Sequence, residues 1–233
     1  MKFRKAMASI KSEHVVTVWE TGVALGVPFL AMEFLEGDTL DDYHKKVGHL
    51  TVEQVVRIGR ETAQGLAAAH SRGLIHRDIK PSNLWLEAPA GRVKILDFGL
   101  ARATAGSREI SQAGAILGTP AFMAPEQARG ETVDYHADLF SLGCVLYFLC
   151  TNELPYKGTD VMSTLMALAT HDPQPPQAIS AKIPAALSDL IMQLLRKDPG
   201  QRPNSSQAVI QALAAIEQEL GTSNREAAMT FQR

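Results

Sequence analysis

The chain has 233 residues, of which 45% are hydrophobic, and this is enough to bury the core of one large domain or of two lobes. A formal net charge of -2 is unlike the basic composition of nucleic-acid-binding proteins, and no apolar run is long enough to span a membrane. The cysteines, Cys144 and Cys150, lie in an apolar helical run that points them to different faces. We therefore expect no disulfide, no nucleic-acid partner, no membrane segment and a cytoplasmic location.

The first part of the sequence predicts a small set of elements. Residues 2–11 carry apolar side chains at a helical spacing, and residues 15–20 and 29–34 are rich in strand formers. A turn over 22–28 would join the two strands as a hairpin. Because a two-stranded sheet with one helix is a poor domain by itself, we expect structure upstream to complete it.

From residue 39 onwards the pattern is mainly helical. Thr51 and Gln54 form a capping box that opens a long amphipathic helix, which we expect to end near 72–73. Two short strands, at 84–86 and 93–96, come after it. Further helices are predicted at 124–129, 134–151, 159–170, 184–195 and 204–220.

Some local expectations accompany these elements. The small and polar residues at 103–118 predict a mobile loop, and Met162 and Met166 share a helical face that we assign to the core. Asn204 is expected to cap the last helix. The polar residues 221–233 lack periodicity and are expected to fray.

Three short motifs occur in order in the helical half of the chain. They are His-Arg-Asp with a following Asn at 76–83, Asp-Phe-Gly at 97–99 and Ala-Pro-Glu at 124–126. Each tripeptide is weak by itself, but the ordered set is specific because each motif supplies a different part of one reaction. On these residues, the chain from about 29 to 220 resembles the larger lobe and hinge of eukaryotic-like serine/threonine protein kinases, of the kind also found in bacteria.

The resemblance implies an α+β, protein-kinase-like fold with two lobes, mainly the helical C-terminal one. Residues 1–35 would form a partial N-terminal lobe with one helix, two strands and the hinge. Residues 36–220 would form the C-terminal lobe with the catalytic loop and the activation segment, and 221–233 a flexible tail. The resemblance also implies ATP and Mg²⁺ as cofactors and a protein Ser or Thr hydroxyl as the acceptor.

The resemblance assigns the chemistry to a few side chains. Asp78 resembles the catalytic base for the substrate hydroxyl, and Lys80 resembles the lysine that neutralises charge on the transferred phosphoryl group. Asn83 and Asp97 resemble the two Mg²⁺ ligands, and so they also form part of the nucleotide site. Thr119 matches the threonine that helps to bind the acceptor residue.

The adenine end of the nucleotide is assigned to the hinge. Met32 resembles the gatekeeper, and the backbone groups of Glu33 and Leu35 would meet the adenine. Trp85 stands where the family usually has an aliphatic residue under the adenine ring. An indole there would either stack on the base or crowd the pocket, and the sequence leaves both readings open.

Structural and regulatory roles follow from the same resemblance. Glu126 and Arg202 resemble a buried ion pair that ties the activation segment to the lower lobe. Asp138 resembles the aspartate that holds the backbone of the catalytic loop. Arg77 resembles the arginine that binds a phosphorylated residue of the activation loop, for which Ser111 is the first candidate.

The sequence departs from the family at its N-terminal end. The glycine-rich loop and the strand lysine are missing, and Phe3 falls near the place of the glutamate with which that lysine pairs. A gene start assigned too late, or a cut gene, competes with a natural degenerate kinase as the explanation. We favour the first because the four catalytic side chains are all present, and we expect the chain as written to bind ATP weakly and to phosphorylate poorly.

Two other functions stay open at this point. A non-catalytic, pseudokinase-like scaffold would use the helical lobe for binding alone. A small-molecule kinase of the aminoglycoside type shares a similar Asp…Asn loop. Thr119, Arg202 and the Ala-Pro-Glu motif at 124–126 speak against that second alternative, because they serve a peptide-substrate platform.

Overall fold

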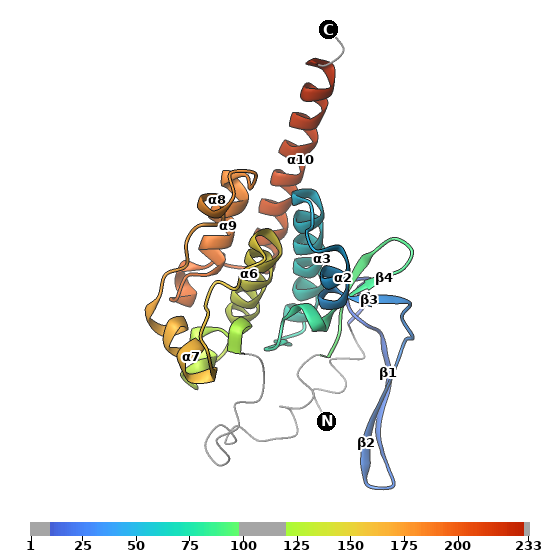
Figure 1. Cartoon of the computed structure of the whole chain (residues 1–233). Coiled ribbons are helices and arrows are strands. Elements are labelled where there is room, and N and C mark those ends of the chain that lie inside the picture. Colours follow the sequence, from blue (N-terminus) through green and yellow to red (C-terminus); the bar gives the residue numbers. More distant parts are fainter. Residues whose placement is uncertain (1–9, 98–119, 231–233) are drawn as a thin grey trace.

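The computed structural model describes residues 10–97 and 120–230 (Figure 1). Most of the predicted helix at 2–11 lies outside this part, and its last two residues are not helical. The predicted mobile loop at 103–118 also lies outside the described residues. Within them, helices combine with two small sheets, and this confirms the predicted α+β class.

The helical body is built around α6 (His136–Thr151), whose side chains are buried nearly all round. Helices α3 (Val52–His70) and α9 (Ala185–Leu194) pack against it, and α10 (Ser206–Thr230) packs against α3 (Figure 1). The buried helix predicted here is confirmed, and its two cysteines are free thiols. No described helix has the length and the apolar character that crossing a membrane requires. The remaining helices are α2 (Leu40–Val47), α5 (Pro125–Ala128), α7 (Val161–Thr170) and α8 (Pro176–Ile179), with the short 3-10 helices η1 (Pro81–Asn83), η2 (Pro120–Phe122) and η3 (Pro199–Gln201).

Helix α3 begins where its capping box predicts. Gln54 N donates to Thr51 Oγ1 at 3.3 Å, and Thr51 N donates to Gln54 Oε1 at 2.9 Å. The helix ends at His70, slightly before the predicted end. Gly65 allows a close approach, because a Cβ there would lie 2.6 Å from the carbonyl oxygen of His14. The helix that leads into the catalytic loop is thus fixed at its start and packed tightly against the segment before the hairpin.

A three-stranded antiparallel sheet lies beside α3. Its strands, in the order β3-β4-β5, are β3 (Gly37–Thr39), β4 (Leu84–Glu87) and β5 (Arg92–Ile95). The second and third confirm the predicted strands, whereas β3 was not predicted because its sequence looks like a break. Gly37 has a φ of 123°, and a Cβ there would lie 2.1 Å from the carbonyl oxygen of Leu86. Glycine therefore lets this short strand pair with β4.

Strands β1 (Val18–Ala24) and β2 (Val27–Met32) form a hairpin that projects from the body (Figure 1). Its turn consists of Leu25 and Gly26, with φ values of 52° and 81°. Two residues with positive φ suit the twist of a tight hairpin. The predicted wide turn over 22–28 is therefore wrong, since the strands run through most of it.

Three smaller expectations also need correction. Met162 and Met166 are 69% and 61% exposed, because α7 turns another face to the body. Helix α10 is capped by Ser205, whose Oγ accepts a backbone N–H of the first turn at 3.1 Å, rather than by Asn204. The same helix continues to Thr230, through much of the segment that was expected to be irregular.

Candidate active site

The backbone of the loop at 76–83 is anchored by a carboxylate from α6. Asp138 is fully buried, and its two oxygens accept the backbone N–H groups of His76 at 2.8 Å and of Arg77 at 2.7 Å. A buried carboxylate is stable only when such donors surround it. The loop therefore has a fixed position at its start, and the contact predicted for this aspartate is present.

His70, the last residue of α3, supports the same carboxylate. Its Nε2 lies 2.7 Å from Asp138 Oδ2, and its Nδ1 lies 2.9 Å from Ser206 Oγ at the start of α10. One imidazole thus joins three helices around the anchor of the loop. No sequence pattern predicts this role of His70, because its partners are 68 and 136 positions away along the chain.

Arg77 has a left-handed backbone, with a φ of 68°. Such a conformation costs a non-glycine residue about 1–3 kcal/mol and persists where the surroundings hold it. Here Asp138 binds the N–H of Arg77, and Gln127 Nε2 donates to its carbonyl oxygen at 2.9 Å. The side chain of Arg77 is exposed, whereas its predicted partner, Ser111, lies outside the described residues.

His76 is fully buried and connects the loop to the strand that follows it. Its Nε2 lies 2.7 Å from the carbonyl oxygen of Leu96, and Asp78 N donates to its Nδ1 at 3.2 Å. These contacts define a neutral ring with the proton on Nε2. Burial lowers the pKa of His76, although the nearby carboxylates of Asp138, Asp78 and Asp97 act to raise it. Asp78 and Leu96, the residue before Asp97, therefore both hydrogen-bond to this one imidazole.

The residue before the predicted metal ligand is held at both of its backbone groups. Leu96 N donates to the carbonyl oxygen of Asn83 at 2.9 Å, and Leu96 O accepts from His76. Asp97 comes next, is exposed and has a left-handed φ of 46°. The two hydrogen bonds therefore bring the loop at 76–83 and Asp97 to the same place, although the rest of the Asp-Phe-Gly motif lies outside the described residues.

Within the loop, two side chains converge on one oxygen of Asp78. Lys80 Nζ lies 2.8 Å from Asp78 Oδ2, and Asn83 Nδ2 donates to the same oxygen at 3.0 Å. Asn83 Nδ2 also donates to the backbone carbonyl of Asp78 at 2.8 Å. The carboxylate of Asp78 is thus oriented by its neighbours through one of its two oxygens.

The donor set fits a hard cation such as Mg²⁺. Two acceptors face the nitrogen of the Asn83 carboxamide, so its oxygen must point the other way and is available as a ligand. The exposed carboxylate of Asp97 supplies a second hard oxygen. Among the described residues no group of three or more His, Cys, Asp or Glu forms a metal cage. Mg²⁺ does not need one, because it usually binds one or two protein oxygens together with phosphates and water.

The hinge residues lie directly after β2. Glu33 N donates to the carbonyl oxygen of Thr17 at 3.0 Å, so what Glu33 can offer an adenine is its carbonyl group. Leu35 is partly exposed, and Met32, at the end of the strand, is 41% exposed. These positions stay predictions for the adenine contact.

Trp85 lies half-buried on β4, with its neighbours in the strand turned to the core. Its Nε1 donates to the carbonyl oxygen of Glu36 at 3.1 Å, so the indole is tied to the segment that follows the hinge. A fixed indole at this place offers a flat surface to a base. The contact of Trp85 with the adenine stays a prediction.

Glu126 and Arg202 form a buried, two-pronged ion pair. The guanidinium nitrogens lie 2.6 Å and 2.8 Å from the two carboxylate oxygens. Arg202 also donates to three backbone carbonyls and lies over the ring of Phe140, 4.9 Å from its centroid. Thr119, the predicted acceptor-binding residue, lies just outside the described part of the chain.

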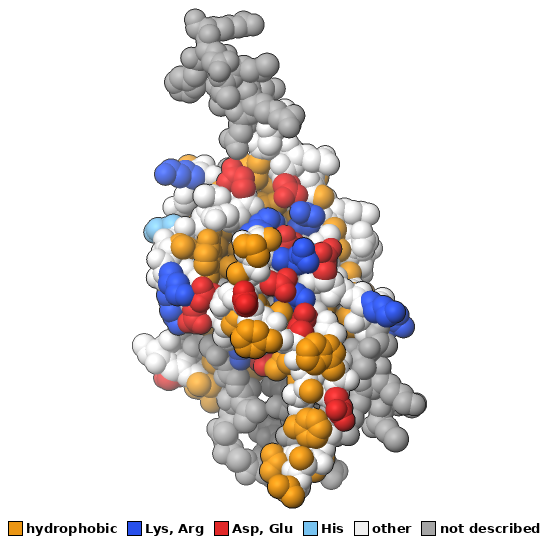
Figure 2. Space-filling view, turned by 90° about the vertical axis from the view of Figure 1, so that its right-hand side faces the viewer, with side chains coloured by type: hydrophobic (Ala, Val, Ile, Leu, Met, Phe, Trp, Pro, Cys, Tyr) orange, Lys and Arg blue, Asp and Glu red, His pale blue; other side chains and the backbone are white. Residues whose placement is uncertain are grey.

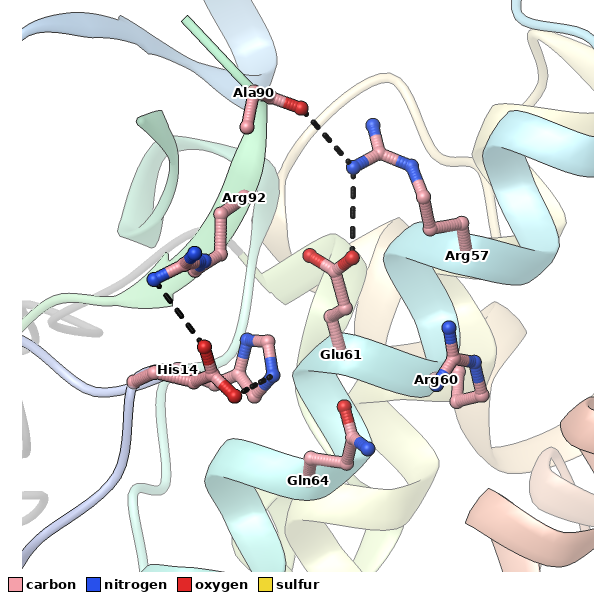
Figure 3. Close-up of a pocket in the computed structure, with 8 residues that line it drawn as sticks. His14, Arg57, Arg60, Glu61, Gln64, Ala90 and Arg92 are labelled. Carbon is pink, nitrogen blue, oxygen red and sulfur yellow. Dashed lines mark hydrogen bonds and ion pairs between the residues drawn. The ribbon is translucent and has the colours of Figure 1, made fainter. Parts of the chain in front are cut away.

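A separate polar pocket of about 270 Å³ lies between α3 and the β4–β5 turn (Figure 3). Its charges are largely paired with one another. Arg57 lies 3.5 Å from Glu61, and Arg92 lies 3.2 Å from Glu13. These pairs join the helix to the strands, and no predicted site residue lines the pocket. The lining residues are Glu13, His14, Arg57, Arg60, Glu61, Gln64, Ala90 and Arg92.

Comparison with known proteins agrees with this geometry. Residues 4–213 match the family model described as "Protein kinase domain". Over 94% of its own length, the chain is 36% identical to a probable serine/threonine-protein kinase of Clostridium perfringens. Over 87% of its own length, it is 36% identical to the serine/threonine-protein kinase PknB of Mycobacterium tuberculosis. It is 35% identical to the serine/threonine-protein kinase pkn3 of Myxococcus xanthus over 92%. The matched parts cover 32%, 33% and 41% of these relatives, so the chain spans roughly a third of their length.

Proposed function

The chain belongs to the protein kinase family, and on this premise we propose that it transfers the γ-phosphoryl group of ATP to Ser or Thr hydroxyls of proteins, with Mg²⁺ as the metal. The observation that supports this best is the pair of hydrogen bonds between Leu96 and the loop at 76–83. Through them the predicted base, Asp78, and the predicted metal ligand, Asp97, come to lie near one buried imidazole.

Each side chain has one task in this proposal. Asp78 accepts the proton of the hydroxyl whose oxygen bonds to the γ-phosphorus, while the bond from that phosphorus to the departing ADP oxygen breaks. Lys80, already 2.8 Å from Asp78, faces the transferred group and offsets its negative charge. Asn83 and Asp97 would hold Mg²⁺, which when bound neutralises charge on the phosphates.

The level of activity depends on the phosphate contacts. The sequence lacks the glycine-rich loop and the strand lysine that hold the β- and γ-phosphates in this family. We therefore propose that the chain as written binds Mg-ATP weakly and turns over slowly. A cytoplasmic location, where ATP and reduced thiols are found, is part of the same proposal.

The test is the transfer of labelled γ-phosphate to a generic basic protein. We expect Asp78→Asn to lower the rate by about 10²–10⁴-fold, the usual contribution of a positioned base. Asp189→Asn changes an exposed aspartate on α9 and is the matched control, which should keep the full rate.

Two outcomes would overturn the proposal. Tight binding of Mg-ATP without any transfer by the unmodified chain would favour a pseudokinase-like scaffold. Transfer to an aminoglycoside in place of the basic protein would favour a small-molecule kinase.

A further inference from the structure

Lys94 is a buried cation that none of the steps above uses. It lies on β5, is 7% exposed, and is directly opposite Trp85 of β4. Its Nζ lies 2.7 Å from Glu33 Oε1 and 3.7 Å from Glu87 Oε1. A lysine is rarely buried without a paired carboxylate, so these two contacts explain how the charge is tolerated.

Glu33 is bound from two sides. Its Oε1 accepts the backbone N–H of Thr17 at 2.7 Å as well as Lys94 Nζ, and its own N–H donates to the carbonyl oxygen of Thr17. Burial by itself would raise the pKa of Glu33, but the hydrogen bonds from Lys94 and Thr17 outweigh it and lower that pKa. The hinge residue is thus held as a carboxylate between the chain before β1 and the strand β5.

The strand that carries Lys94 also leads to the metal end of the site. Ile95, the next residue, donates its N–H to the carbonyl oxygen of His14 at 2.9 Å and accepts from Val16 N at 3.0 Å. Asp97 lies two residues further on. One short strand therefore contacts the hinge through a side chain, the chain before the hairpin through its backbone, and the predicted Mg²⁺ ligand through its continuation.

We propose that Lys94 is a positioning residue for the nucleotide: through Glu33 it holds the hinge backbone that would meet the adenine at a fixed distance from Asp97. A nucleotide would contact the hinge with its adenine and the Mg²⁺ at Asp97 with its phosphates at the same time. A loose hinge would therefore weaken both sets of contacts. This inference rests on the proposed function, because the adenine and Mg²⁺ contacts are those assigned there.

The hydrogen bond from Lys94 matters because the hinge, although Thr17 also binds Glu33 and Trp85 binds Glu36, has exposed apolar side chains. The hairpin on its other side projects from the body, and Phe34, between Glu33 and Leu35, is 89% exposed. A segment with few buried contacts opens readily unless specific hydrogen bonds hold it. Lys94 supplies such a bond from inside the sheet.

The test measures the hinge and the nucleotide separately. Lys94→Met keeps the length of the side chain and removes the charge. We expect amide hydrogen exchange at Thr17 and Glu33, whose N–H groups are hydrogen-bonded to each other's residue, to rise at least about tenfold, and the affinity for Mg-ATP to fall by about the same factor. Lys94→Arg should keep both near the wild-type values. Lys157→Met removes an exposed lysine that pairs with Glu153 at 2.7 Å, and this control should change neither quantity.

Glu33→Gln is the second variant, should Lys94→Met fail to fold, because glutamine still accepts from Thr17 but lacks the charge. It should also raise the exchange of the hinge, and the double variant should add little to either single change. Exchange in Lys94→Met and Glu33→Gln that stays within about twofold of the Lys157→Met control would overturn the inference. If the hinge loosens as expected while the wild-type chain binds no nucleotide, the support of the hinge by Lys94 stands and the proposed function fails.

Discussion

The catalytic loop and the β1–β2 hairpin are held in opposite ways. The loop at 76–83 has little regular structure, yet buried polar groups fix it, chiefly Asp138 and His76, both 0% exposed. The hairpin consists of two paired strands, yet most of its apolar side chains face outwards, with Leu25 104% and Trp19 67% exposed (Figure 2). Regular hydrogen bonding between two strands does not replace a core, whereas a few buried polar groups can fix an irregular loop.

The contrast has a consequence for the surface of the molecule. Apolar side chains gather along the projecting hairpin, in the lower part of the view in Figure 2. An exposed apolar hairpin with unpaired backbone groups at its edges favours association. We therefore expect mutations in the two regions to differ in kind: those around the loop should change stability, and those in the hairpin should change association.

The largest loss of unfolding free energy is expected when the buried ion pair between Glu126 and Arg202 is broken. Arg202→Met leaves Glu126 buried without its partner and should cost about 3–5 kcal/mol of unfolding free energy. Urea denaturation followed by circular dichroism measures this. Arg129→Met, which breaks an exposed pair with Glu131, is the control and should cause no measurable loss. Equal losses in the two variants would show that burial does not distinguish these pairs.

A smaller loss is expected at the anchor of the loop. Asp138→Asn keeps the shape of the side chain but leaves only one acceptor oxygen. In the wild type, the N–H groups of His76 and Arg77 each bind a different oxygen of Asp138. We expect a cost of about 2–3 kcal/mol and faster amide exchange at 76 and 77. Asp189→Asn serves as the exposed control. Exchange that stayed slow in Asp138→Asn would mean that other contacts fix the loop.

The next largest change in unfolding free energy is expected when the pH is lowered. Burial lowers the pKa of both His76 and His44, so the unfolded chain takes up protons at a higher pH than the folded chain does. The stability is therefore complete above the unfolded pKa of about 6.5 and is lost as the pH falls through it, by about 1–2 kcal/mol between about pH 7 and pH 5.5. Urea midpoints across this range measure it.

Carboxylates do not contribute to the loss of stability in this pH range. The carboxylates whose pKa is lowered on folding, among them Glu33 and Asp160, have ordinary pKa values of 4.5 and 3.8, so their contribution to stability is lost only below this pH range. His44→Asn should reduce the slope by removing one of the two histidines. A stability that rose on acidification to about pH 5.5 would contradict the neutral, buried state of His76.

The smallest effect on stability is expected in the hairpin. Leu25→Asn places a residue that tolerates positive φ before Gly26 and removes a fully exposed apolar side chain. The unfolding free energy should rise by about 0.5 kcal/mol or less, while self-association in sedimentation velocity should decrease. A loss above about 1 kcal/mol would mean that Leu25 is packed.

The sequence by itself determined the local elements and the family. Helix α3 with its Thr51 capping box, the buried α6 and the strands β4 and β5 were predicted because spacing and capping act within a few residues. The three ordered motifs identified the protein kinase family, which the comparisons confirm. The hairpin turn was placed wrongly, because its signal lies in the positive φ of Leu25 rather than in a recognisable turn pair.

The family resemblance assigned Asp138 and the Glu126–Arg202 pair as supports, but the tertiary structure alone decided which further side chains support the site. His70 meets a partner 136 positions away, and Lys94 meets the hinge glutamate 61 positions away. It also decided that Met162 and Met166 face outwards, because the direction in which an apolar helix turns depends on what packs against it. Contacts between distant segments leave no periodic pattern in the sequence, so the supporting roles of His70 and Lys94 became visible only when the chain was folded.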